Sequence, residues 1–339
     1  MKIVCIQSPR YDYLTATLNE GLLELGHEVI ASEDSNYTKK SPDELIRRAA
    51  PTADLIIVYS NWKVRTSLVQ NLDHPLKVFV DGSDQQEFFV YPHMVFRAVF
   101  KRELNKLWKS PHGESVFPLP FAAEKRYFTK PSAPGKRDLT LSFAASMVTN
   151  AARHSLWLRL LARNDPAIFA GSTGERAYDQ RIGYPIETPK FRELLHRSKV
   201  SVNAVGIGYD CGRFWEILAS GAMLLTQELD IQIPHPFTDG KNCVVFKSFD
   251  DFEAKVDQIC AGQIDAAGIA RAGCEHLLAH HTTAKRAEYF LSCVARLKEP
   301  GQGKACQSFY QGPPPAGPGL HQRVLRKARR VISRVTGSA

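Results

Sequence analysis

The chain has 339 residues, of which 44% are hydrophobic and 23% are charged, and this composition excludes a disordered protein. Its formal charge of +9 raises nucleic acid and anionic membranes as partners. Seven basic residues and no acidic residue lie between positions 300 and 339, so residues 1–299 carry only +2. The charge is therefore concentrated in a tail, which argues against nucleic acid as a partner.

The cysteines and the apolar runs indicate in which cellular compartment the protein lies. Seven cysteines are scattered without a CxxC pair, which argues against a disulfide framework and a structural zinc site. No apolar run approaches the ~20 residues that span a bilayer, and the N-terminus turns polar too early for a signal peptide. We expect a soluble cytoplasmic protein.

The first part of the chain alternates short apolar runs with helical patterns. We predict strands at 2–7, 27–31, 54–59 and 76–80, and helices at 14–25, 42–49 and 66–72. Alternation of this kind is typical of parallel βαβ units in an open α/β sheet. Two more apolar runs follow before a segment with Lys, Pro and Gly that reads as a linker.

The alternation then restarts. We predict strands at 139–144, 167–170, 200–205, 223–226 and 243–246, and helices at 151–163, 191–197, 213–220, 250–260, 265–280 and 284–297. Two such alternations predict two Rossmann-like domains, at 1–122 and 138–299, joined by a linker at 123–137 and followed by a tail at 300–339. Ligands of such folds bind at the carboxyl ends of the strands, here in the cleft between the domains.

A glycine-rich loop after the predicted strand 200–205 carries the most chemistry. It contains Gly206, Gly208 and Gly212, and a helix begins near Arg213. Glycines admit a close ligand, a helix N-terminus offers free N–H groups to phosphate, and the arginine fork suits a diphosphate. Glu216 lies one turn further along, where it would reach sugar or ribose hydroxyls. The same glycines also form a loosened dinucleotide fingerprint, so an NAD-dependent Rossmann enzyme is an alternative.

Several runs resemble a known family. They are DCGRFWEILASGAMLLTQ (210–227), PFTDGKNCVVF (236–246), HTTAKRAEYFL (281–291), VFKREL (99–104) and VFPLPFA (116–122). Together they are similar to the glycosyltransferase group 1 family, and within it to the spore-maturation CgeB-like branch. The resemblance implies a GT-B fold, a nucleotide-sugar donor held mainly by the second domain, and no obligatory metal or cofactor. It also implies that the helix 284–297 crosses back to the first domain.

The resemblance assigns roles to individual positions. It places Glu216 on the donor ribose, and Gly212 and Arg213 on the loop that approaches the phosphates. Many relatives carry a second glutamate eight positions earlier, which touches the transferred sugar. That position is Gly208 in this chain, and Asp210 is the nearest substitute.

A second loop, at 145–153, follows the first strand of the second domain. Ser146, Thr149 and Asn150 are expected to cap the next helix, and Arg153 to reach a diphosphate. A solvated arginine after an ordinary cap explains the same pattern. The two loops would converge only in a Rossmann-like domain.

We expect the acceptor site and the catalytic base in the first domain. The predicted strand 76–80 is followed by Asp81, Asp84 and His93, which are side chains of the type that can act as a general base. Lys101 and Arg102 are either contacts for an anionic acceptor or solvated. No Asp-x-Asp motif is present, so we expect no metal site.

The tail combines a linker at 300–319 with a basic amphipathic helix at 320–335, the form of a peripheral anchor on anionic lipid. The whole pattern predicts a metal-independent glycosyltransferase that acts on a glycan, lipid-linked or cell-envelope acceptor in polysaccharide biosynthesis. The main alternative is a GT-B scaffold that binds a nucleotide sugar without turnover.

Overall fold

The computed structural model describes residues 1–7, 12–31, 47–60, 69, 72–88, 96–110, 115–128, 137–147, 149–173 and 188–297. The predicted helices 42–49 and 66–72 fall largely outside this part. His93 and the tail 300–339 lie wholly outside it, so their predictions stay predictions.

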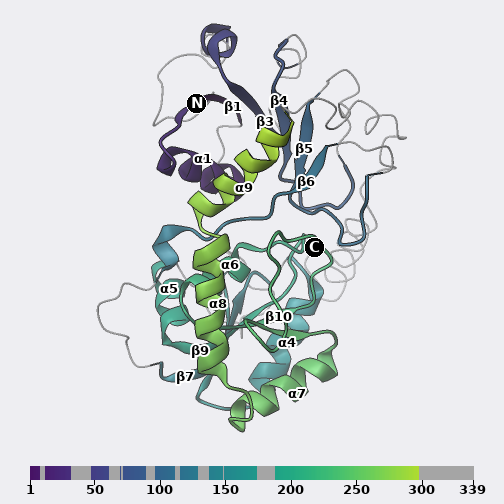
Figure 1. Cartoon of the computed structure of the whole chain (residues 1–339). Coiled ribbons are helices and arrows are strands. Elements are labelled where there is room, and N and C mark those ends of the chain that lie inside the picture. The colour runs from purple at the N-terminus through teal and green to yellow at the C-terminus, as the bar shows by residue number, and fades with distance from the viewer. Residues whose placement is uncertain are drawn as a thin grey trace, which may run out of the picture.

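The first domain is built on a six-stranded parallel sheet (Figure 1). Its order is β2-β1-β3-β4-β5-β6, so successive strands are added first on one side of β1 and then on the other, and the strand order reverses between β1 and β3. The strands are β1 (Lys2–Ile6), β2 (Glu28–Ala31), β3 (Leu55–Tyr59), β4 (Lys77–Asp81), β5 (Ala98–Lys101) and β6 (Val116–Pro118). The helical elements are α1 (Tyr13–Glu24) and the short η1 (Ala50–Thr52). The predicted parallel βαβ pattern is confirmed, and the two later apolar runs supply β5 and β6.

The second sheet has five parallel strands in the order β11-β10-β9-β7-β8. They are β7 (Leu139–Ala145), β8 (Ile168–Ser172), β9 (Ser198–Asn203), β10 (Met223–Gln227) and β11 (Val244–Phe246). The helices around it are α4 (Ala151–Ala162), α5 (Thr188–Arg197), α6 (Gly212–Ala219), α7 (Phe249–Cys260) and α8 (Ala266–His280). The predicted strands and helices of this half all appear, with ends shifted by a few residues. Here the strand order reverses between β7 and β9.

The strands are apolar on both faces because each sheet is covered on both sides. Along β1, Ile3 and Cys5 pack into one hydrophobic core while Val4 and Ile6 pack into another on the opposite face. Side chains alternate across a strand, so a strand buried on both faces reads as a continuous apolar run. The first of these cores continues into the second domain, where it includes Trp215.

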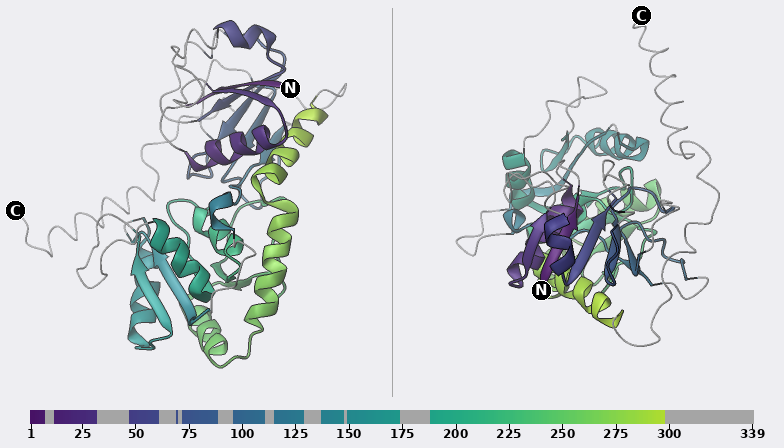
Figure 2. Two further views of the ribbon diagram at one scale, coloured as in Figure 1. Left: turned by 90° about the vertical axis from the view of Figure 1, so that its left-hand side faces the viewer. Right: turned by 90° about the horizontal axis from the view of Figure 1, so that it is seen from above.

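Helix α9 (Thr283–Arg296) joins the two domains. It continues from α8 in the second domain and lies beside α1 in the first, which confirms the predicted crossing (Figures 1 and 2). A Cβ on Gly21 of α1 would meet the Thr283 carbonyl oxygen at 2.0 Å, so only glycine allows this approach. The Thr283 hydroxyl also donates to Glu24 at 2.9 Å.

A short 3₁₀ helix, η2 (Lys125–Tyr127), lies in the segment predicted as a linker. Tyr127 is buried there, and its ring contacts Phe191 of α5 edge-on at 6.4 Å between centroids. This segment therefore packs onto the second domain.

Candidate functional site

The glycine loop (residues 204–211) runs from β9 to α6, and it meets the loop that follows β7. The Asn150 side chain caps α4 by accepting from the Ala152 N–H at 2.9 Å, and its Nδ2 donates to the Gly206 carbonyl at 3.1 Å. β7 and β9 are neighbours at the point where the strand order reverses. Open α/β sheets bind ligands at the carboxyl ends of the strands at such a point. The predicted convergence of the two loops is confirmed.

Arg153 supports the glycine loop through hydrogen bonds. Its Nε and Nη2 donate to the Ala204 carbonyl at 3.2 and 2.9 Å, and its Nη1 donates to Thr149 Oγ1 at 2.7 Å and to the Ser146 carbonyl at 3.3 Å. A Cβ on Gly206 would meet Arg153 Nη2 at 2.8 Å, which explains the glycine. Burial, aided by the charge of Arg213, lowers the pKa of Arg153 to about 10.

These contacts change the roles expected of the 145–153 loop. Asn150, rather than Ser146 or Thr149, caps α4. All three guanidinium nitrogens of Arg153 donate hydrogen bonds within the protein, so this side chain shapes the loop rather than reaching for a diphosphate. Ser146 and Thr149 hold Arg153 in place.

The N-terminus of α6 lacks the side-chain cap found on other helices. Its N-cap is Cys211, which makes no side-chain hydrogen bond to the first turn. The N-caps of α1, α4, α7, α8 and α9 each do so. The first N–H groups of a helix need partners, and here the side chain of the N-cap supplies none. This end of α6 is therefore open to an anionic group.

Arg213 stands on the first turn of α6. Its guanidinium lies over the Phe191 ring at 5.5 Å, and its Nη2 donates weakly to Thr173 Oγ1 at 3.4 Å. Its Nε is buried and has no hydrogen-bond partner among the described residues. Burial lowers the pKa of Arg213, with Glu216 acting in the opposite direction. A cation with an unused donor beside an open helix end is suited to bind a phosphate.

Glu216 is half-buried one turn further along α6, against residues from the first domain and η2. Burial raises its pKa, while Arg213 and a hydrogen bond from Tyr127 oppose the rise. The charge of Glu216 and, more strongly, burial raise the pKa of Tyr13 at the start of α1. A Cβ on Gly212 would contact Glu216 Oε1 and Tyr13 Cε2 at 3.5 Å each, so Gly212 lies between them. Gly212, Arg213 and Glu216 thus lie close together at the start of α6.

On the first-domain side, Asp81 ends β4 and is fully buried. Its Oδ2 pairs with Lys101 at 2.8 Å and its Oδ1 accepts from the Ser83 N–H at 3.0 Å. Lys101 also donates to the Gln85 carbonyl at 2.6 Å, so it is neither solvated nor open to an acceptor. Asp81 therefore fixes the turn after β4 and is not free to serve as a base.

Asp84 is the more accessible carboxylate of this edge, with 47% of its side chain exposed. It pairs with Arg102, whose side chain is 3% exposed and donates through Nη1 to the Asp210 carbonyl at 3.0 Å. The Asp84 backbone also adjoins Gly208, because a Cβ there would lie 3.2 Å from the Asp84 carbonyl oxygen. Asp84 therefore borders the glycine loop from the side of the first domain.

Asp210 connects the glycine loop to the first domain. Its Oδ2 accepts from the Phe121 N–H at 2.7 Å and its Oδ1 from Trp215 Nε1 at 2.8 Å. Burial raises its pKa, and Arg102 is the strongest opposing influence. Both of its oxygens are engaged and the residue is buried, so it braces the loop and does not replace a sugar-binding glutamate.

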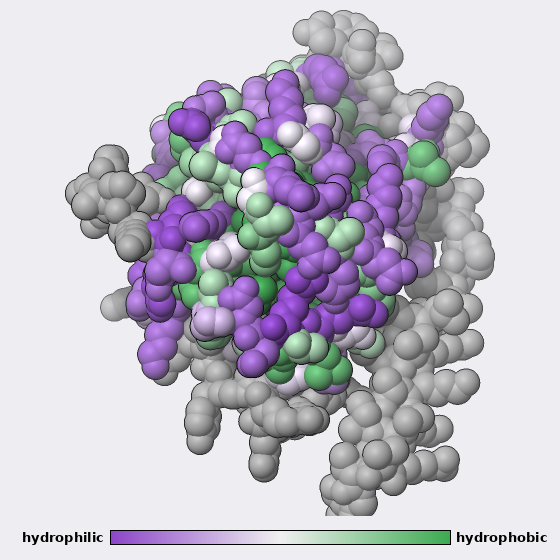
Figure 3. Space-filling view, turned by 90° about the horizontal axis from the view of Figure 1, so that it is seen from below, coloured by the Kyte–Doolittle hydropathy of each residue, from purple (hydrophilic) through white to green (hydrophobic). Residues whose placement is uncertain are grey.

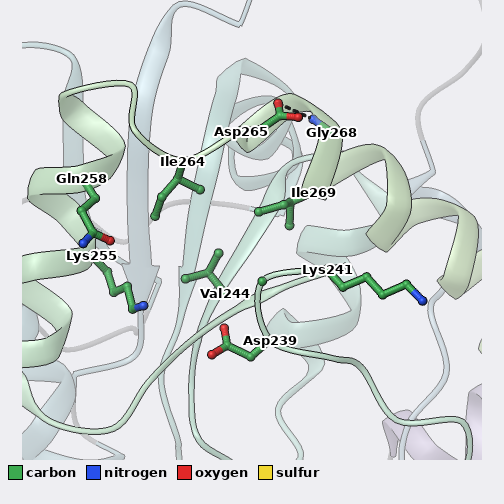
Figure 4. Close-up of a pocket in the computed structure, with 10 residues that line it drawn as sticks. Asp239, Lys241, Val244, Lys255, Gln258, Ile264, Asp265, Gly268 and Ile269 are labelled. Carbon is green, nitrogen blue, oxygen red and sulfur yellow. Dashed lines mark hydrogen bonds between the residues drawn. The ribbon is translucent and has the colours of Figure 1, made fainter.

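A hollow of 630 Å³ lies elsewhere on the second domain, between α7, α8 and the segment before β11 (Figure 4). Val244, Ile264 and Ile269 form its apolar wall, with Lys241 and Lys255 at its rim. It lies where β11 begins, whereas the glycine loop follows the end of β9. The surface seen from below is largely hydrophilic with a small apolar area near its middle (Figure 3).

Within the described ranges, no group of three or more His, Cys, Asp and Glu side chains is placed to hold a metal ion. Over the same ranges, none of the helices has the length and apolar character needed to cross a membrane.

Comparison with known proteins identifies the fold built around this site. A family model described as glycosyl transferase-like matches residues 153–292, which include the glycine loop, Arg213 and Glu216. This part of the chain is therefore similar to that family. A search of curated proteins found no match. The family model does not distinguish the CgeB-like branch, which stays a prediction.

Solved structures match nearly the whole chain. A glycosyltransferase from Rickettsia africae aligns with a TM-score of 0.60 and 11% identity, over 87% of this chain and 98% of that one. HepE of Anabaena, solved with UDP, aligns at 0.57 and 12% over 87% and 100%. A DNA-modifying β-glucosyltransferase, solved with and without uridine diphosphoglucose, aligns at 0.57 and 16% over 86% and 98%. The chain therefore has the GT-B glycosyltransferase fold, and these matches do not favour the NAD-dependent alternative.

The sequence reasoning missed three side chains of the site. Tyr13 and Tyr127 lie in segments interpreted as a helix start and a linker, and Glu103 sits in a run used only for its resemblance. A buried-looking charged run, Lys101 to Glu103, directly after an apolar strand was the one available signal.

Proposed function

We propose that the protein transfers a sugar from a nucleoside diphosphate-sugar to an acceptor held between the two domains. The main support is Arg213, whose Nε has no hydrogen-bond partner among the described residues. It lies next to Glu216 and beside the end of α6 at which the N-cap side chain makes no hydrogen bond. The glycosyl transferase-like family match over this segment supports the same reading. Because similar proteins have been solved with UDP and with uridine diphosphoglucose, a uridine nucleotide is the first donor to test.

In this mechanism the diphosphate leaving group is stabilised by Arg213 and by the first N–H groups of α6. Glu216 accepts hydrogen bonds from ribose hydroxyls. These fixed charges and dipoles take the place of a metal ion, so we propose a metal-independent reaction. Asp84 is the candidate for the acceptor contact or base, because it is accessible and borders the glycine loop. His93 remains a second candidate and lies outside the described residues.

We further propose a hexosyltransferase that acts on a glycan or lipid-linked acceptor in polysaccharide biosynthesis at the cytoplasmic face of a membrane. The support is the sequence of residues 320–335, where basic side chains fall on one side of a helical pattern and apolar ones on the other. Anionic lipid attracts such a segment at about 1 kcal/mol per basic residue near the surface.

The experiment is calorimetry of the full chain with a panel of UDP-, GDP- and dTDP-sugars, followed by measurement of donor hydrolysis and of transfer. Binding with turnover supports the proposal. Binding without turnover, even with Asp84 intact and a range of acceptors, supports the alternative of an inactive nucleotide-sugar-binding protein. If none of the nucleotide sugars binds, both are refuted.

A further inference from the structure

Glu103 is a buried carboxylate of the first domain that reaches into the second. It follows β5 and is 0% exposed. Its Oε2 accepts from the Tyr209 N–H at 2.9 Å and its Oε1 from the Asp210 N–H at 3.0 Å. These are two successive amides of the glycine loop, so one side chain from the opposite domain fixes the direction of both.

The loop is shaped to receive this carboxylate. A Cβ on Gly208 would lie 2.4 Å from Glu103 Oε1 and 2.8 Å from Glu103 Cδ, distances that no real Cβ keeps. Glycine at this position thus leaves space for Glu103. Any larger side chain would displace the carboxylate from the amides.

The charges around Glu103 come from both domains. Arg102 lies 3.6 Å away and is the strongest cation, Asp210 is the nearest carboxylate, and the Tyr209 phenol and Asp84 (through Arg102) lie further out. Burial is the largest influence and raises the pKa of Glu103 to about 7. The side chain can therefore change charge near neutral pH.

We propose that Glu103 is a positioning residue that clamps the glycine loop from the first domain and so sets the geometry of the donor site. The loop leads directly into α6, so the orientation of its amides sets the position of the Arg213 turn. Among the described residues, Glu103 is the side chain that bonds both the Tyr209 and the Asp210 amides. The clamp acts on the donor through the loop and does not touch it.

The first test needs no ligand. Hydrogen exchange of residues 206–212 is measured in wild type, in Glu103→Gln and in Glu24→Gln. Gln offers one acceptor where the carboxylate offered two, so exchange at the Tyr209 and Asp210 amides should rise about tenfold. Glu24 is the matched control, since it also connects the first domain to α9 but has no contact with the loop. Unchanged exchange in Glu103→Gln overturns the clamp.

The second test is a double-mutant cycle on donor affinity, and it rests on the proposed function. Glu103→Gln and Gly208→Ala should each weaken binding of the panel's best nucleotide sugar about tenfold, while Glu24→Gln changes it less than twofold. In a Glu103→Ala background, Gly208→Ala should cost less than threefold, because the carboxylate that it would displace is gone. Additive losses, or tighter binding by Glu103→Gln, refute the proposal.

The third readout is pH. Ionised Glu103 accepts both amides more strongly, so wild-type affinity for a nucleotide sugar should rise between pH 6 and 8. In Glu103→Gln, which retains Arg102 and Asp210, this rise should disappear. A rise of equal size in both proteins contradicts the clamp. If wild type binds no nucleotide sugar, the proposed function fails and the exchange experiment alone decides on Glu103.

Discussion

Replacing Arg213 by methionine separates binding from stability. Met preserves most of the volume and apolar contact of the side chain, but it has neither the charge nor the fork of donors. Among the described residues, Arg213 makes a 3.4 Å hydrogen bond to Thr173 and a cation–π contact with Phe191 at 5.5 Å. Together these are worth about 1–2 kcal/mol.

Burial works against those contacts. The lowered pKa of Arg213 means that the folded protein disfavours its charged form, so removing the charge recovers free energy. Glu216 loses a neighbouring cation in the variant, which offsets part of this gain. The free energy of unfolding should therefore change by no more than about 1 kcal/mol, and Tm by no more than about 2–4 °C.

Donor binding should respond quite differently. A hydrogen bond from a charged donor to a phosphate is worth about 1.5–3 kcal/mol, so Arg213→Met should weaken binding roughly ten- to hundredfold. Calorimetry with the nucleotide-sugar panel and thermal unfolding without ligand measure the two effects. Arg213→Lys, which keeps the charge without the fork, should lie between. A large fall in Tm with unchanged affinity would refute the assignment of Arg213 to the donor.

Four other outcomes are expected. Glu216→Gln should weaken donor binding by about 1–3 kcal/mol in calorimetry, and equal affinity would remove Glu216 from the site. Arg153→Met should behave oppositely to the Arg213 variant, lowering the free energy of unfolding by about 2–4 kcal/mol in denaturant titration, because buried carbonyls lose their donors. His281 should make the fold acid-sensitive, because burial and the Arg286 charge lower its pKa to about 2. The free energy of unfolding should therefore be complete above pH 6.5 and fall by about 2 kcal/mol at pH 5. His281→Gln should reduce this loss, and an identical pH profile in the variant would contradict the prediction. Removing residues 300–339 should release the protein from anionic vesicles without changing donor affinity, and equal vesicle binding would exclude the tail as the anchor.

The His281 prediction follows from geometry as well as from burial. Its Nε2 must donate to the His235 carbonyl at 3.0 Å, and its Nδ1 must then accept from Arg286 at 2.9 Å. The contact with Arg286 requires the neutral ring, because a protonated Nδ1 cannot accept a hydrogen bond. Arg286 also donates to the Phe121 carbonyl at 3.2 Å, so protonation of His281 would disturb the junction between the domains.

The sequence predicted the elements well because their signals are local. Apolar runs of five or six residues indicated buried parallel strands, and α6 was predicted at 213–220 and is found at Gly212–Ala219. Arg213 and Glu216 lie on one helix, so a single turn of spacing was enough to place them together. The same reasoning could not tell that the side chains of Asp81, Asp210 and Arg153 would be engaged in hydrogen bonds within the protein. Each side chain has the right chemistry, but its partners lie in other segments.

By itself, then, the sequence determined two parallel α/β domains, the glycine loop and the arginine–glutamate pair of α6. Each of these depends on periodicity or spacing within about twenty residues. Only the tertiary structure decided which charged groups remain available to a ligand. Glu103 and the Tyr209 amide are 106 positions apart, and Arg102 and the Asp210 carbonyl are 108 apart. Such pairs form because the ends of strands from two sheets meet, and burial there shifts the pKa of Glu103 and Asp210.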